Sequence, residues 1–176
     1  VGGLKGTLTN AEPSTAWIAG KNGGALHLDG KDDRIFVPHA AAIDFADESF
    51  TVSFWMRWNK AVAPHGQHLI TKGGYEASKP GETGKRWEIY VSSAQTLCFT
   101  IDDNVKASRI QVALAPFSTG EWVHLTVVRD TAAKQLRFYA NGVLLAPSVP
   151  EKSAGSKRSD RTGVDITGSI ANPQRL

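Results

Sequence analysis

The sequence lacks the paired acids that hydrolysis of a glycosidic bond requires. Retaining hydrolysis uses two carboxyl groups about 5–5.5 Å apart, which one strand can present at alternate positions because these share a face. No glutamate has an acidic residue two positions away, and Glu88 alone lies in an aromatic, strand-like segment. The glutamates are Glu12, Glu48, Glu76, Glu82, Glu88, Glu121 and Glu151. We therefore expect no catalytic residues and no enzymatic activity.

Aspartates gather instead in two places where the chain is expected to turn. Asp29, Asp32 and Asp33 fall within five residues of one another, and residues 102–104 read Asp-Asp-Asn. Calcium takes six to eight oxygen ligands, which neighbouring acids in turns and backbone carbonyls supply. Aspartates also favour turns because their side chains bond the local backbone. Calcium is the cofactor that these clusters favour, and ordinary turn chemistry is the alternative.

Aromatic and cationic side chains offer a different chemistry, which is the recognition of sugars. Sugar rings stack on exposed aromatic faces, while polar side chains hold the hydroxyl groups. The aromatic candidates are Trp55, Tyr75, Trp87, Tyr90 and Tyr139. The basic segment 152–161 adds Arg158, which would bind an acidic glycan or an acidic protein neighbour. Such a run of charge is also typical of a solvated loop.

Composition excludes several other functions. The 176 residues carry a formal net charge of +3, which is too small for a protein whose main partner is a nucleic acid. No stretch approaches the roughly 20 apolar residues of a membrane helix. The only cysteine, Cys98, excludes an internal disulfide framework. It lies between Leu97 and Phe99 and is expected to be a small buried side chain.

The elements that must position these residues are strands. Residues 49–58 alternate strictly, with Phe50, Met56 and Trp58 among the side chains of one face and Trp55 on the other. Similar runs recur at 25–28, 34–38, 68–72, 86–92, 96–102, 108–114, 121–129, 135–140 and 143–145. Many short strands without long helices predict an all-β fold, an antiparallel β-sandwich.

One hairpin is predicted with particular clarity. Asn141-Gly142 lies between two apolar runs, and a type I′ turn needs positive φ at both of its central residues. We expect the strands that contain Trp122 and Phe138 to form a paired arm that ends in this turn.

Four segments resemble the laminin G-like branch of the concanavalin A-like lectin/glucanase superfamily. They read GALHLDGKDDRI at 24–35, ESFTVSFWM at 48–56, GEWVHLT at 120–126 and LRFYANG at 136–142. The resemblance implies a jelly-roll sandwich over residues 1–176 as a single domain. It also implies a structural calcium ion held by Asp29 and Asp33, because many relatives carry one near this turn. The strand that closes such domains is not recognisable here, so we expect the chain to be part of a larger polypeptide.

These observations favour a recognition function. We expect a non-catalytic adhesion or binding module of an exported or cell-surface protein, with a carbohydrate or glycoprotein as its partner. One alternative is a structural subunit of a surface filament or coat that assembles with other chains through its sheet edges. A weaker alternative is an enzyme that acts on glycans. Neither nucleic acid binding nor insertion into a membrane is expected.

Overall fold

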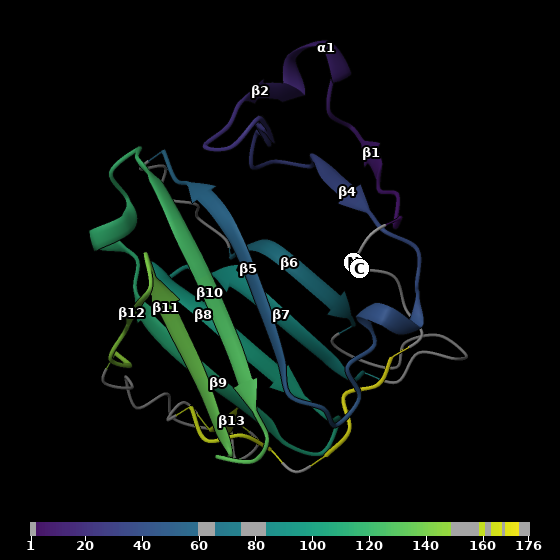
Figure 1. Cartoon of the computed structure of the whole chain (residues 1–176), viewed down its shortest axis with the longest axis vertical. Coiled ribbons are helices and arrows are strands. Elements are labelled where there is room, and N and C mark those ends of the chain that lie inside the picture. The colour runs from purple at the N-terminus through teal and green to yellow at the C-terminus, as the bar shows by residue number, and fades with distance from the viewer. Residues whose placement is uncertain are drawn as a thin grey trace.

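Two antiparallel sheets face each other across one hydrophobic core (Figure 1). The computed structural model describes residues 3–59, 66–74, 84–148, 159–160, 163–166 and 168–172. Within these residues strands predominate, and helical structure is limited to α1 (Pro13–Ala16) and two 3-10 turns at Ala41–Ile43 and Ala115–Phe117. The prediction of an all-β sandwich is confirmed.

The first main sheet has the strand order β12-β11-β10-β5. Its strands are β5 (Phe50–Arg57), β10 (Trp122–Asp130), β11 (Gln135–Ala140) and β12 (Val143–Leu144). Alternation along β5 has the predicted phase, because Phe50 and Met56 are buried while Trp55 is exposed. Burial on one face and exposure on the other is the usual state of an antiparallel sheet.

The second main sheet has the order β13-β9-β8-β7-β6. Its strands are β6 (Gln67–Gly73), β7 (Arg86–Val91), β8 (Thr96–Asp102), β9 (Ala107–Ala113) and β13 (Ser159–Asp160). The pairing of β13 with β9 is parallel, and the other pairings are antiparallel. Every residue of β7 is buried, so both faces of this strand are covered although one of them is polar.

Side chains from both sheets fill the core. Leu125 and Phe138 come from the four-stranded sheet, and Ile89 and Phe99 come from the five-stranded sheet. The rings of Phe50 and Phe99 meet edge to face across the sandwich, with 6.0 Å between their centroids. Each fully buried side chain of this size contributes about 1.5–3 kcal/mol through the hydrophobic effect. The core therefore fixes the relative position of the two sheets.

The Asn141-Gly142 turn has the predicted conformation. Its φ angles are 49° and 80°, and the Asn141 side chain also accepts a hydrogen bond from the backbone N–H of His124. The turn joins β11 to β12, however, and not β10 to β11 as expected. Residues 131–134 make the latter connection, and the pairing of β10 with β11 itself is confirmed.

The N-terminal residues form two small antiparallel pairs beside the main sheets (Figure 1). They are β1 (Thr7–Thr9) with β4 (Arg34–Phe36), and β2 (Trp17–Ala19) with β3 (Gly24–Leu26). The loop that carries the first aspartate cluster lies between β3 and β4. Among the described residues, no helix has the length and apolar character needed to cross a membrane.

Candidate functional site

The side chains of β6 to β9 that point away from the core form a polar layer, which we call the polar face. Most of these side chains are buried, and Arg109 is among the few that are partly exposed. On β7 and β8 the register sets Arg86 opposite Asp102 and Glu88 opposite Thr100. On β9, Arg109 lies opposite Thr100 in turn. The polar face also includes His68, Thr71, Tyr90, Cys98 and Gln111. Four strands thus gather charged, aromatic and amide groups on one surface.

A β-bulge in β6 brings His68 onto the polar face. His68 pairs with Tyr90 and Ile70 pairs with Ile89, with a shift in register between the two pairs. Because neighbouring residues of a strand point to opposite faces, this shift turns His68 outward while Ile70 packs against the core. The His68 ring stacks on Tyr90 with 5.5 Å between the ring centroids.

An ion network occupies one end of the polar face. Arg86 Nε lies 3.3 Å from Glu88 Oε1, and Arg86 Nη1 lies 2.8 Å from Asp102 Oδ2. His68 Nδ1 approaches the other oxygen of Glu88, Oε2, at 3.5 Å. Arg86, Glu88 and Asp102 are all buried. Sequence spacing did not reveal this pair of carboxylates, because strand pairing and not alternation brings Glu88 and Asp102 to the same arginine.

Arg109 lies at the other end of the polar face and, unlike Arg86, has no carboxylate partner among the described residues. Its Nε donates to Thr100 Oγ1 at 3.1 Å, and its guanidinium carbon lies 5.4 Å from the centroid of the Tyr90 ring. Within the described part of the chain, its terminal nitrogens pair with no carboxylate and donate no hydrogen bond. The Gln111 side chain makes no hydrogen bond in those residues either. Arg109 is half-buried, so its unpaired N–H groups are accessible to a ligand.

The Tyr90 ring lies between these two ends and is 9% exposed, in contact with His68 and Arg109, so it does not present the exposed aromatic face that was predicted. Burial raises the pKa of its phenol above the usual 10.0, and the neighbouring Cys98 and Glu88 raise it further against the effect of Arg109. The phenol therefore keeps its proton at physiological pH. Cys98 is fully buried beside it, as predicted.

The prediction that Trp87 presents an exposed ring is wrong. Its side chain is 3% exposed and packs in the core, with 5.7 Å to the ring centroid of Phe45 and 5.6 Å to that of Phe50. The reason is its phase on β7, which it shares with the core residues Ile89 and Val91. Trp87 therefore stabilises the sandwich and does not line the polar face.

Trp55 and Tyr139 lie on the opposite side of the molecule, on the outer face of the four-stranded sheet. Trp55 is 38% exposed, its ring centroid lies 5.1 Å from that of His124, and Lys21 Nζ lies 5.6 Å above the Trp55 ring. Tyr139 is half-buried and pairs with Thr126 on β10. The structure thus separates these two aromatic candidates from Tyr90, which faces outward from the other sheet. Tyr75 and Arg158, the remaining candidates, lie outside the described residues.

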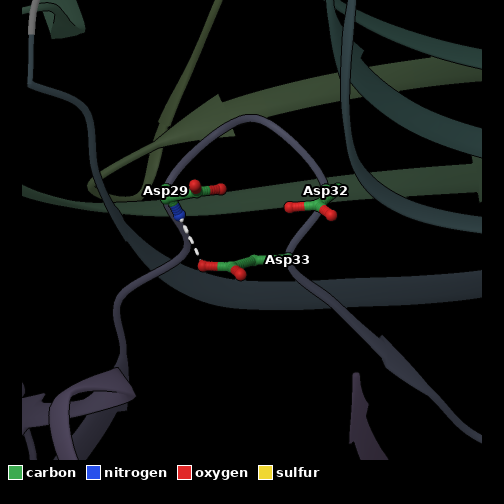
Figure 2. Close-up of side chains that lie close together, drawn as sticks. All are labelled: Asp29, Asp32 and Asp33. Carbon is green, nitrogen blue, oxygen red and sulfur yellow. Dashed lines mark hydrogen bonds between the residues drawn. The ribbon is translucent and has the colours of Figure 1, made fainter. Parts of the chain in front are cut away.

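The three aspartates of the β3–β4 loop point toward one another (Figure 2). One carboxylate oxygen of Asp29, one of Asp32 and one of Asp33 lie within 4.8 Å of one another. Asp33 Oδ2 accepts a hydrogen bond from the Asp29 N–H at 2.8 Å, which holds the ends of the loop together. Asp29 Oδ1 accepts another from the Lys31 N–H at 2.8 Å, the main cause of the lowered pKa of Asp29.

The donor chemistry of this loop fits calcium. Asp32 Oδ2 accepts a hydrogen bond from Asn10 Nδ2 at 2.9 Å, so each of the three aspartates bonds the protein through one oxygen. The second oxygen of Asp29 lies 3.9 Å from Lys31 Nζ, a long contact at an exposed lysine. Hard cations such as Ca²⁺ bind oxygens of this kind. The second predicted cluster behaves differently, because Asp102 joins the polar face and Asp103 accepts hydrogen bonds from the backbone N–H groups of Val105 and Lys106.

Comparison with solved structures finds resemblance to a carbohydrate-binding module, CBM40 of the Ruminococcus gnavus IT-sialidase. The structure with α2,6-sialyllactose is 14% identical over 75% of this chain and 74% of that chain, with a TM-score of 0.40. A second structure of the module is 13% identical over 76% and 74% of the two chains, with a TM-score of 0.42. The structure with α2,3-sialyllactose is 13% identical over 75% and 73%, also with a TM-score of 0.42.

No curated protein matches this chain in sequence. A family model does match, and it spans residues 29–168, from the first aspartate of the β3–β4 loop to the segment after β13. That range includes both main sheets, the polar face and the three aspartates. The chain belongs to the concanavalin A-like lectin/glucanase superfamily.

Proposed function

We propose that this protein is a non-catalytic carbohydrate-binding module and that the polar face is its binding surface. The observation that carries the proposal is the half-buried guanidinium of Arg109, stacked on Tyr90 beside the unpartnered amide of Gln111. Side-chain donors held in a fixed position are suited to the polar rim of a sugar, and the buried Tyr90 ring supports the arginine in this role. Membership of a superfamily of lectins and glucanases supports the same reading.

The carboxylates of the polar face act as structural groups in this proposal. General acid catalysis needs a carboxyl group within hydrogen-bond reach of the leaving oxygen. Glu88 and Asp102 are instead buried and directed at Arg86. Their contribution is to hold the positions of the strands that carry Tyr90 and Arg109.

Calcium in the β3–β4 loop forms the second part of the proposal. Asp29, Asp32 and Asp33 would supply three carboxylate oxygens, and backbone carbonyls or water the rest. The loop is tied to the sheet that bears the polar face, because Gln67 Nε2 on β6 donates to the Gly30 carbonyl at 3.0 Å. A bound ion would therefore stiffen the edge of that sheet. We place the module outside the cell or on its surface, a location that fractionation of the producing cells tests.

A glycan array probed with the labelled protein tests the function directly. We expect binding to a subset of glycans, loss of that binding in Gln111→Ala, and retention in Trp55→Ala. The second variant removes the most exposed aromatic candidate from the opposite sheet and is the matched control. Loss in Trp55→Ala with retention in Gln111→Ala would move the site to the four-stranded sheet. A folded protein that binds no glycan on a broad array would overturn the proposed function.

A further inference from the structure

We propose that the polar face selects saccharides that carry a carboxylate or sulfate group, and that Arg109 binds this group. The inference rests on the proposed function and narrows it from carbohydrates in general to acidic ones. It also assigns a specificity-determining role to a residue that sequence patterns did not single out.

Few groups of the polar face remain available to a ligand. The carboxylates of the polar face are engaged, since Glu88 contacts Arg86 and His68, and Asp102 contacts Arg86. Among the described residues, the Arg109 terminal nitrogens and the amide of the buried Gln111 have no partner on this face. A guanidinium offers only donors. A ligand at this end of the face must therefore contribute acceptor oxygens.

The orientation of the Arg109 guanidinium also favours an acidic ligand. Arg109 is fixed at two points, by the hydrogen bond from Nε to Thr100 and by the ring of Tyr90 beneath its guanidinium. The planar fork of terminal N–H groups is thus held in place before a ligand arrives. Such a fork matches the two oxygens of a carboxylate or sulfate, and the charged hydrogen bonds are about twice as strong as neutral ones. A neutral hydroxyl group would use only part of this geometry.

The distribution of charge on the polar face favours an anion near Arg109. Arg86 and Arg109 balance Glu88 and Asp102 on the polar face, and both carboxylates lie on the Arg86 side. An incoming anion would meet the unpaired arginine and not an unpaired carboxylate. The Tyr90 phenol adds no negative charge, because its raised pKa keeps it protonated. Arg109 is also only half exposed, so water screens its charge less than on an open surface.

Matched pairs of ligands test the inference by calorimetry. One pair is an oligogalacturonide and its methyl ester, which differ in the carboxylate charge. The other is a sulfated oligosaccharide and its desulfated form. We expect each acidic member to bind at least about tenfold more tightly than its neutral partner. Binding of one acidic class alone would identify the anionic group, and equal binding of acidic and neutral members would overturn the inference while leaving the proposed function intact.

Substitutions at Arg109 test the assignment of the residue. Arg109→Gln should remove the preference for the acidic member, and Arg109→Lys should restore part of it, because lysine keeps the charge but lacks the fork. Arg57→Gln, on the outer face of the other sheet, is the matched control for loss of a positive charge. Unchanged selectivity in a folded Arg109→Gln would contradict the assignment. If Arg109→Gln fails to fold, the selectivity of Arg109→Lys, compared with that of the wild type for the same ligand pairs, tests the assignment in its place.

Discussion

Arg129 donates through Nε to both oxygens of the Asp165 carboxylate, at 3.1 Å each, with both side chains almost fully buried. Its terminal nitrogens donate to the backbone carbonyls of Ala46, Ile166 and Gly168. One side chain on β10 thereby joins the segment before β5 to the segment after β13. Burial raises the pKa of Asp165 more than Arg129 lowers it, so the pair fixes position at a cost in desolvation.

Breaking this pair should destabilise the fold strongly. Asp165→Asn leaves the Arg129 charge buried without a counterion, and we expect a loss of about 3 kcal/mol in the free energy of unfolding. Arg129→Met should cost more, because it strands the carboxylate and three carbonyls together. Urea denaturation at pH 7 measures both variants.

The matched control is the partly exposed pair between Arg137 and Asp130, whose nitrogen and oxygen lie 2.9 Å apart. Pairs near the surface contribute about 0–1 kcal/mol, so Arg137→Gln should remain close to the wild type. A loss in Asp165→Asn no greater than that in Arg137→Gln would show that the buried pair does not secure these segments.

The same exposed pair gives a prediction about pH. The pKa of Asp130 is lowered from 3.8, first by the Ala133 backbone N–H and then by Arg137. A carboxyl with a lowered native pKa stabilises the fold above the unfolded pKa and loses this effect as the pH falls through the native value. Arg137→Gln should therefore raise the pKa of Asp130 only part of the way back to 3.8. The small loss of stability in this variant should disappear in acid, where Asp130 is protonated in both proteins. NMR titration of the Asp130 carboxyl carbon measures the shift, and a full return to 3.8 would contradict the dominant role of the Ala133 N–H.

The turn at Asn141-Gly142 provides a test of local conformation. Gly142 has a φ of 80°, so Gly142→Ala should cost about 1–2 kcal/mol by forcing a Cβ into the left-handed region. Gly24→Ala is the control, because its added Cβ meets nothing closer than a Trp17 ring atom at 3.8 Å and a strand favours alanine over glycine. Thermal unfolding of the two variants should differ clearly. Equal midpoints would show that β12 does not depend on this turn.

Calcium should raise the melting temperature if the β3–β4 loop binds it. At a concentration one hundred times its dissociation constant, an ion adds about 2.7 kcal/mol to the stability. We expect an upward shift of several degrees over EDTA-treated protein, and its loss in the double variant Asp29→Asn, Asp33→Asn. Asparagine keeps an acceptor for the loop's hydrogen bonds but removes the charge. Asp47→Asn, at an exposed site outside the cluster, should respond as the wild type does. Identical midpoints with calcium and with EDTA would refute the site.

The alternation of apolar and polar residues along the strands predicts which side chains are buried, and this applies to the candidate site residues as well. The rule that placed Phe50 and Met56 in the core also applies to Trp87, which shares its phase with Ile89 and Val91. Attention to residue type in place of phase produced the error at Trp87. The same rule would have marked Arg129 as a charge in a core position of β10, in phase with buried valines and leucines.

The polar face itself could not be derived from spacing along the chain. Glu88 and Asp102 meet because residues 92–95 set the register of β7 against β8, and this turn uses a positive φ at Gln95, a residue type that gives no turn signal. Register between strands is a tertiary property. Side chains that come together only through the register between strands cannot be predicted from the pattern of each strand alone.

The extra residue in β6 has a further consequence for how this strand tolerates change. Removal of Leu69 would restore a regular ladder in which His68 still lies opposite Tyr90 and Ile70 still lies opposite Ile89. A single-codon deletion here would thus leave the imidazole on the polar face and remove only an apolar side chain that packs against the core. The pairing of His68 with Tyr90 sets the outward position of the imidazole, so this strand can lose one residue without exchanging its two faces.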